Sequence, residues 1–249
     1  MELITLGTSA AYPTVTRACS GYLIREGTTT ILVDAGSGVT RNLMRWISPS
    51  LLDAIIISHF HQDHFIDIYP LYYFLAFHPV EHRPLDVYAP EGARDFILQL
   101  FPPGSGSNLD TVYNFKPLRD RGYFTIGDIE CQSIRTRHSL TTYGVRVSGR
   151  HLISYSSDTG FDEVLYDIAS GSDIFICEAT MQQEREDLLH LTSAQAGNVA
   201  RKARVKKLVL THIWPDFEPV ESLRMAAEHY DGPIIMAEDN MQIFLDSDR

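Results

Sequence analysis

The segment His59-Phe-His61-Gln-Asp63-His64 places four side chains that can bind metal within six residues. Neutral imidazole and carboxylate groups together suit borderline divalent cations such as Zn²⁺. In this composition the pattern arises by chance in roughly one sequence per thousand. A single histidine is usually a satisfied polar group, but four ligand types at this spacing favour a metal site.

The spacing also indicates how many ions the segment serves. In an extended chain His59 and His61 point to the same side and can share one metal ion. Asp63 and His64 are adjacent, so they must reach elsewhere once the chain turns. We therefore expect this motif to contribute ligands to two metal ions.

Two metal ions need more ligands than this motif contains. His138, Asp158 and His212 each come directly after a β-rich run, so each could lie beside the motif at the end of a strand. The remaining histidines outside such positions are expected at the surface: His78, His82, His151 and His229.

The element that must carry the motif is the apolar run 54–57, which is typical of a strand buried on both faces. The other expected strands lie in 1–6, 21–33, 85–89, 123–137, 143–155, 174–177, 208–210 and 234–236. The expected helices are 39–47, 70–77, 194–203 and 222–229. Residues Thr192 to Gln195 fit a capping box at the start of one helix. This order predicts two sheets packed face to face and covered outside by helices.

The 249 residues should bury roughly 70% of their unfolded surface, enough for a sizeable core. Residues 101–108 are rich in Pro, Gly and Ser, and we interpret them as a surface loop. We therefore expect a single domain over 1–249.

Charge and composition narrow the partners and the compartment. A net charge of −11 disfavours long nucleic acids as partners. The start of the chain has no basic segment, and no run of 18 apolar residues occurs, so we expect no membrane association. Cys19, Cys131 and Cys177 form no paired motif, which favours a reducing, cytoplasmic location.

The segments HFHQDH, RTRHS, YSSDTG and THIWP, in this order, resemble the metallo-β-lactamase superfamily. The opening LGTSAAYPT and LVDAGSG extend the likeness over nearly the whole chain. The resemblance is closest to the branch that includes ribonuclease Z and related small phosphodiesterases. It implies an α/β (α+β) fold, a four-layer αββα sandwich, with a dinuclear metal site at one edge.

The resemblance also implies which residues bind the two divalent ions. Asp34 would orient the ligands by binding them on the side away from the metal ions. Alternatively, Asp34 stabilises a turn or caps an element with its carboxylate. Zinc is the preferred ion, with manganese or iron also compatible with these ligands. The implied ligands are His59, His61 and His138 for one ion, Asp63, His64 and His212 for the other, and Asp158 as a bridge.

The reaction expected of such a site is hydrolysis. Two divalent ions roughly 3.5 to 4 Å apart lower the pKa of a shared water and offset charge on the attacking and leaving oxygens. With two such ions and a hydroxide beside Asp63 and Asp158, the local charge is about +1. A small anionic ester is therefore favoured even though the whole protein is acidic.

His190 lies just before the capped helix, where ribonuclease Z and related phosphodiesterases carry a histidine. The resemblance implies that His190 protonates or stabilises the leaving group, with Asp63 and Asp158 as its catalytic partners at the metals. Glu178 ends the preceding strand and could orient His190. Alternatively, His190 caps the start of the helix.

We therefore expect a dinuclear hydrolase of a small phosphodiester, such as a cyclic nucleotide. Pre-tRNA is a second candidate, disfavoured because the chain lacks a basic arm and carries Gln62 where the tRNA enzyme has glycine. A lactone or sulfate ester is a further alternative, as is a metal-dependent binding module. The aromatic segment 69–77 is expected in the core, with a homodimer face as the alternative.

Overall fold

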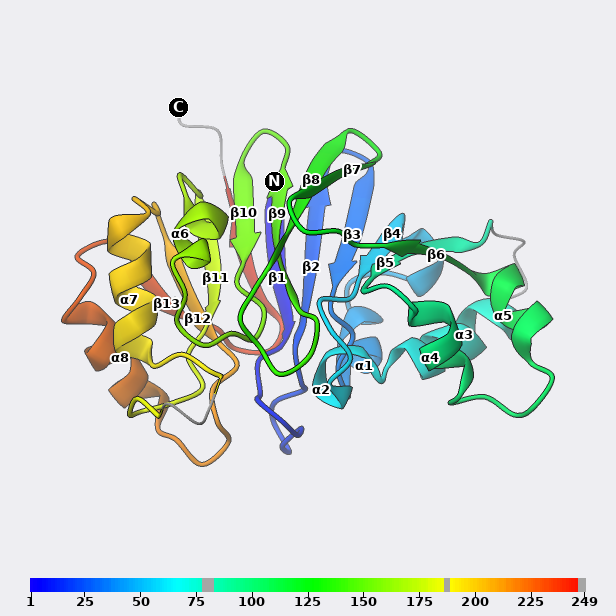
Figure 1. Ribbon diagram of the computed structural model, residues 1–249, viewed down its shortest axis with the longest axis horizontal. Coiled ribbons are helices and arrows are strands. Elements are labelled where there is room, and N and C mark those ends of the chain that lie inside the picture. The colour runs from blue at the N-terminus through cyan, green and yellow to red at the C-terminus, as the bar shows by residue number, and fades with distance from the viewer. Residues whose placement is uncertain (78–82, 186–188, 246–249) are drawn as a thin grey trace.

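A computed structural model describes residues 1–77, 83–185 and 189–245. Within these residues the chain forms two mixed sheets of seven strands each, shown in Figure 1. The first sheet has the order β14-β1-β2-β3-β4-β5-β6, and the second has the order β13-β12-β11-β10-β9-β8-β7. In each sheet an antiparallel part passes into a parallel part, at β3 in the first and at β10 in the second.

The strands of the first sheet are β1 (Glu2–Gly7), β2 (Gly21–Glu26), β3 (Thr29–Val33), β4 (Ala54–Ile56), β5 (Leu85–Ala89), β6 (Tyr113–Pro117) and β14 (Met241–Phe244). The strands of the second sheet are β7 (Gly122–Ile126), β8 (Ile129–Arg135), β9 (Tyr143–Ser148), β10 (Leu152–Tyr155), β11 (Ile174–Glu178), β12 (Leu208–Thr211) and β13 (Ile234–Met236). The last strand, β14, returns to pair with β1 at the edge of the first sheet.

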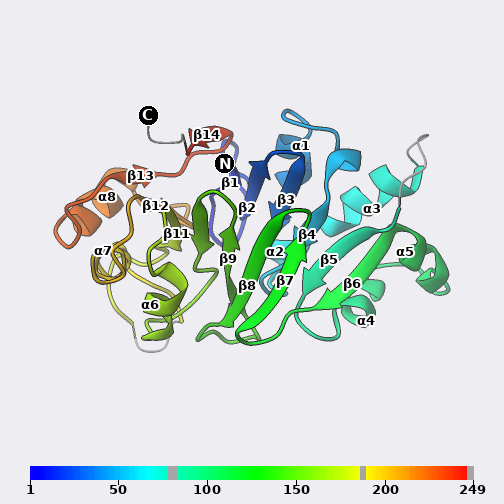
Figure 2. The same ribbon diagram turned by 90° about the horizontal axis from the view of Figure 1, so that it is seen from above.

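Helices cover the outer face of each sheet. Those beside the first sheet are α1 (Val39–Leu43), α2 (Gln62–Phe65), α3 (Ile68–Phe77), α4 (Ala93–Leu98) and α5 (Gly106–Val112), with a 3-10 turn η1 (Pro49–Leu51). Those beside the second sheet are α6 (Val164–Ala169), α7 (Ser193–Lys202) and α8 (Pro219–Ala227). Figure 2 shows the two sheets between these two sets of helices. The predicted four-layer αββα sandwich is confirmed.

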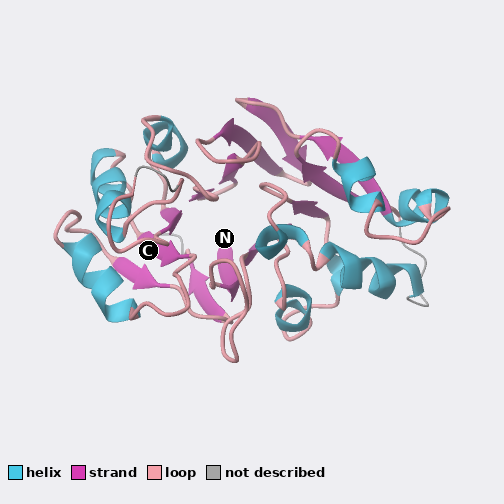
Figure 3. Ribbon diagram, turned by 60° about the horizontal axis from the view of Figure 1, so that its bottom comes forward, coloured by secondary structure: helices cyan, strands magenta, loops and turns pink. Residues whose placement is uncertain are grey.

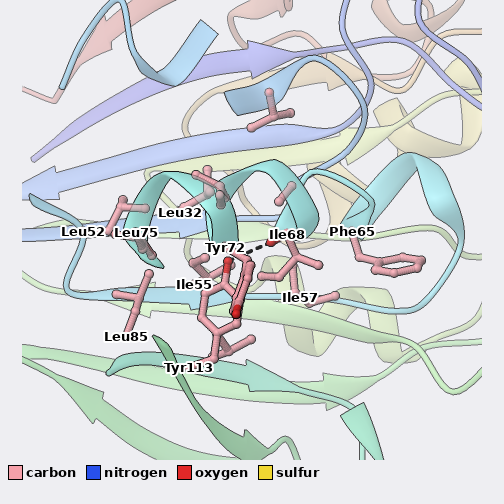
Figure 4. Packing of buried hydrophobic residues seen from close by; sticks show 14 of the residues in the cluster. Leu32, Leu52, Ile55, Ile57, Phe65, Ile68, Tyr72, Leu75, Leu85 and Tyr113 are labelled. Atoms are coloured by element: carbon pink, nitrogen blue, oxygen red, sulfur yellow. Dashed lines mark hydrogen bonds between the residues drawn. The ribbon is translucent and has the colours of Figure 1, made fainter. Parts of the chain in front are cut away.

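Three apolar layers hold the sandwich together. Strand β4 shows how one segment serves two of them, because its side chains alternate between the faces of the sheet. Ile55 and Ile57 pack toward the outer helices, whereas Ala54 and Ile56 pack between the sheets. The prediction that this strand is buried on both faces is therefore confirmed. Figure 4 shows the outer layer, where the Tyr113 hydroxyl donates to the Ile68 carbonyl at 2.8 Å.

Two expected elements differ from the structure. The helix expected over 39–47 ends at Leu43, and the chain continues as turns through Trp46. This boundary lies among tertiary contacts, since Asn42 Nδ2 donates to the Leu6 carbonyl and Trp46 Nε1 donates to Asn240 Oδ1. The loop expected over 101–108 gives way to α5 at Gly106. The capping box is confirmed, since Thr192 Oγ1 accepts from the Gln195 amide and Gln195 Oε1 accepts from the Thr192 amide.

The aromatic segment of α3 only partly enters the core. Tyr72 is buried against Phe101 and Tyr113, but Tyr73 and Phe77 are 39% and 78% exposed. The expectation of a core segment is therefore right for Tyr72 and wrong for the other two, because they lie on the outer side of the helix.

The structure can be compared with the sequence for the cysteines and for the apolar length of the helices. Each of the three cysteines is buried and free of a disulfide. Among the helices of the described residues, none has the length and apolarity needed to cross a bilayer.

Candidate metal centre

Four strand ends from both sheets converge at one edge of the sandwich, which Figure 3 turns toward the viewer. His59 follows β4 of the first sheet, and three residues follow strands of the second sheet: His138 after β8, Asp158 after β10 and His212 after β12. The strands predicted before these residues are confirmed. Their side chains meet because the two sheets are packed face to face.

The chain turns within the histidine motif itself. His59 follows β4, and His61, which is in extended backbone, directly precedes α2. Asp63 and His64 lie on α2, so they leave the direction of the first two histidines. This turn separates the motif into two ligand groups, as the spacing predicts.

The first group joins three imidazoles to one carboxylate. His61 Nδ1 lies 3.1 Å from His59 Nε2 and 3.1 Å from His138 Nε2. Asp158 Oδ2 lies 3.6 Å from His59 Nε2 and 4.0 Å from His138 Nε2. The four potential ligand atoms lie within 4.8 Å of one another, a spacing that one metal ion can bridge.

The second group contains Asp63, His64 and His212. His212 Nε2 lies 3.2 Å from Asp63 Oδ2 and 3.3 Å from His64 Nε2. These three ligand atoms also lie within 4.8 Å of one another. A second metal ion therefore fits beside the first.

Asp158 lies between the two groups. Its Oδ2 atom faces His59, while its Oδ1 atom lies 3.2 Å from His64 Nε2 and 3.5 Å from His212 Nε2. Oδ1 is buried and accepts no hydrogen bond from the described residues. A buried carboxylate oxygen without a hydrogen bond is costly, and a cation shared with the facing nitrogens would relieve that cost.

The other nitrogen of each imidazole sets the ligand geometry. His64 Nδ1 donates to Asp34 Oδ2 at 2.8 Å, and His138 Nδ1 donates to the Leu189 carbonyl at 3.1 Å. His212 Nδ1 donates to Thr180 Oγ1 at 2.7 Å. These bonds leave the lone pairs of the three Nε2 atoms directed at the centre, as metal ligands require.

Asp34 is the hub of this supporting network. Its backbone has a φ of 57°, in the left-handed region that Asp tolerates better than most residues. Oδ1 accepts from the Ser58 amide at 2.8 Å. Oδ2 accepts from the Ser58 hydroxyl at 2.9 Å, the Tyr155 hydroxyl at 2.9 Å and His64 Nδ1. Asp34 therefore lies where it can orient His64.

Burial and charge act differently on the two groups. Burial lowers the pKa of His59 well below its usual value, with help from neighbouring imidazoles. Burial also opposes the charged form of His64, but Asp158, Asp34 and Asp63 outweigh it and raise the pKa of His64 well above its usual value. Three carboxylates around one imidazole create a demand for positive charge, which divalent cations meet. The donor set fits zinc, manganese or iron.

His190 lies beside both groups, and its ligand atom is within 4.8 Å of those of Asp158 and His212. Its ring is 5.2 Å from the His138 ring and 5.6 Å from the His212 ring. His190 Nδ1 donates to Glu178 Oε1 at 3.1 Å. Burial opposes the charged imidazole, but Glu178 outweighs it and raises the pKa of His190 to about 9.

Glu178 is fully buried at the end of β11 and is held by several donors. It accepts from the Thr159 amide at 2.6 Å, the Leu191 amide at 3.2 Å and the Thr180 hydroxyl at 2.7 Å. Since Thr180 also accepts from His212, Glu178 is linked to a potential ligand as well as to His190. The sequence alone does not point to Thr180 or Tyr155, because neither residue type marks a metal site.

A pocket of about 420 Å³ opens beside His190. Its walls include Arg137 and Gly160, which lie next to the potential ligands, and Phe161 and Gln195. Its volume lies within the range of small-molecule sites, about 300 to 1,000 Å³.

The histidines expected at the surface lie apart from this centre. His229 is exposed, and His151 is half-buried with Nδ1 3.6 Å from Asp173 Oδ2. His78 and His82 lie outside the described residues.

The match to known proteins covers most of the chain. The β-lactamase superfamily domain matches residues 29–213. The chain belongs to the β-lactamase superfamily. The likeness inferred from the sequence motifs is thereby confirmed.

Individual relatives agree with this assignment. YhfI of Bacillus subtilis is 27% identical over 234 residues, covering 92% of this chain and 93% of YhfI. The crystal structure of that metallo-β-lactamase fold protein superposes with a TM-score of 0.89 at 24% identity, covering 97% and 98% of the two chains. YhfI is itself named a probable metallo-hydrolase, and the superposition shows that the two chains share one fold.

Two further crystal structures show the same fold. The short form of human tRNase Z superposes with a TM-score of 0.82 at 24% identity, covering 99% of this chain and 100% of the enzyme. A diphosphatase from the PhnP family superposes with a TM-score of 0.80 at 17% identity, covering 98% of each chain.

Proposed function

We propose that this protein is a dinuclear metal-dependent hydrolase of small phosphodiesters, such as cyclic nucleotides. The observation that carries the proposal is the place of Asp158 between two groups of potential ligands, with His190 beside both. Two adjoining metal sites of this kind suit in-line displacement at phosphorus.

In this proposal Asp158 would contribute a ligand oxygen to each of two divalent ions, with zinc the preferred metal because imidazole and carboxylate ligands suit it. When bound, the ions would offset negative charge on the ester and lower the pKa of a water. The other ligands would be His59, His61 and His138 for one ion, and Asp63, His64 and His212 for the other.

His190 acts as the general acid in this proposal. In the metal-free protein the Glu178 carboxylate raises the pKa of His190, which favours a protonated imidazole whose Nε2 can donate its proton to the departing oxygen. Glu178 is a positioning residue, since it binds Nδ1 and fixes the ring through its own buried hydrogen bonds.

The pocket beside His190 is then the place for the departing group. The ring of Phe161 offers a flat apolar wall, and the guanidinium group of Arg137 brings positive charge. A ring with polar substituents, such as a nucleoside, matches both features. This match supports a small phosphodiester as the substrate.

Pre-tRNA is the second candidate, favoured by the superposition with human tRNase Z. A net charge of −11 opposes it, because long polyanions are repelled by an acidic protein.

We also propose that residues 1–249 form one domain, since the layer between the sheets joins strands from both halves of the chain.

Hydrolysis of bis(p-nitrophenyl) phosphate by the zinc- or manganese-loaded protein tests the proposal. We expect turnover by the native chain, a lower rate with His190→Ala, and native rates with the matched surface control His229→Ala. On a cyclic nucleotide, whose departing oxygen is an alkoxide, His190→Ala should lose at least about 100-fold. Absence of turnover with either metal would sink the phosphodiesterase proposal. Faster cleavage of a pre-tRNA 3′ trailer than of cyclic nucleotides would favour the second candidate.

A further inference from the structure

A second pocket, of about 280 Å³, lies between the loop before β2, helix α1 and the loop before β14. Three arginines line it: Arg17 from the first loop, Arg41 from α1 and Arg45 just after α1. None of the proposed metal ligands and neither His190 nor Glu178 takes part in it.

The charge of this pocket is unbalanced within the described residues. None of the three guanidinium groups pairs with a carboxylate there, whereas Arg94 and Arg224 elsewhere on the surface each do. Arg17 Nη2 donates a hydrogen bond to the Pro215 carbonyl oxygen at 3.1 Å. In a chain of net charge −11, this local cluster of three arginines favours the binding of an anion.

Asp239 is the single carboxylate that lines the pocket, and its oxygens already accept hydrogen bonds from other parts of the fold. It accepts from the Ala18 amide at 2.6 Å, the Thr8 hydroxyl at 2.9 Å and the Asn42 amide group at 3.0 Å. These bonds tie the last loop to α1 and to the loop before β2, so the pocket floor is rigid. Three guanidinium groups against one carboxylate leave a formal charge of +2.

We propose that this pocket binds a phosphate group, either free or as a phosphate monoester. Guanidinium groups bind phosphate oxygens in paired hydrogen bonds, and a phosphate monoester carries a charge of about −1.5 to −2 near neutral pH. The small volume of the pocket suits a phosphate group better than a large organic anion.

The pocket and the candidate metal centre share one loop. At one end of the loop the Ala11 amide donates to Asp63 Oδ2 at 2.8 Å, and at the other end Arg17 reaches Pro215, three residues after His212. A phosphate on Arg17 therefore lies on the same structural unit as two potential ligands. It could belong to a distal part of the substrate or to a separate small molecule.

Calorimetric titration of the metal-loaded protein with inorganic phosphate tests the proposal. We expect the native chain to bind one more phosphate per chain than the double variant Arg41→Gln/Arg45→Gln, with at least tenfold weaker binding at the altered pocket. The matched control is Arg201→Gln/Lys202→Gln on α7, which removes the same charge from a distant exposed surface. Arg41 and Arg45 are exposed, so an unchanged melting temperature should show that the variant folds.

Superimposable titrations of the native chain and the Arg41/Arg45 variant would overturn the phosphate site. The phosphate could be part of the substrate or a separate ligand. To distinguish the two, kcat/KM of the native chain and of the Arg41/Arg45 variant is measured on a dinucleotide with and without a 5′-phosphate. A tenfold loss of kcat/KM confined to the phosphorylated dinucleotide assigns the pocket to the substrate. Equal kcat/KM values, with phosphate binding lost, assign it to a separate ligand. The titration needs no turnover, so its result stands apart from the proposed hydrolysis.

Discussion

His59 and His138, two of the proposed metal ligands, lie beside the Glu178–His190 pair, yet the pKa values of their imidazoles are shifted in the opposite direction from that of His190. Burial lowers the pKa of His59 and His138, so their rings are neutral with lone pairs free for a metal ion. His190 is also largely buried, but one ionised neighbour, Glu178, raises its pKa. A single buried carboxylate thus separates a proton donor from metal ligands a few ångströms away. The predictions below test this division of roles.

The largest effect is expected from Asp158→Asn. The change neutralises the carboxylate that faces both ligand groups, so kcat/KM should fall by about 10³-fold or more and bound metal should drop below two ions per chain. Metal analysis and initial rates measure both. Full metal content with native rates would contradict the central place of Asp158.

His190→Ala should instead separate catalysis from metal binding. We expect kcat to fall by about 10² to 10⁴-fold, because a general acid is lost, while the metal content stays at that of the native protein. A less demanding leaving group, such as p-nitrophenolate, should reduce the loss compared with an alkoxide. If metal is lost together with the rate, His190 would count as a ligand and not as a proton donor.

Glu178→Gln probes the pKa of His190 in the metal-free protein. Because the folded pKa is raised from 6.5 to about 9, the pair stabilises the fold fully below pH 6.5 and loses that contribution as pH rises through 9. The contribution is at most about 3 kcal/mol. Between pH 6.5 and about 10 the unfolding free energy should therefore fall less in the variant than in the native protein, as measured by denaturant unfolding. Parallel curves would refute the coupling.

The smallest effect is expected from Asp34→Asn, which keeps a residue type that tolerates the left-handed backbone. His64 loses its charged partner, so metal affinity should fall by about 10 to 100-fold. Competition with a chelator measures the change. Asp53→Asn is the matched control, since Asp53 accepts from the Thr30 amide away from the centre; an equal loss there would mean a general effect on folding.

The positions of the proposed metal ligands could largely be anticipated from the sequence, because a strand end is a local property. The apolar run before His59 and the β-rich runs before His138 and His212 are strands in the structure. Helix lengths were less predictable, as at α1, since a helix boundary depends on the contacts that the chain makes next. The return of β14 to the first sheet is likewise a non-local pairing.

Residue type and spacing therefore determined the donor set, the turn within the motif and the capping box, because each depends on neighbours along the chain. Only the tertiary structure decided which nitrogen faces the centre, through Asp34 with His64 and Thr180 with His212. The same holds for the second pocket, where packing brings Arg17 beside Arg41 and Arg45 of another segment. Hydrogen bonds and charges between distant segments exist only after the sheets have packed, so they leave no periodic pattern in the sequence.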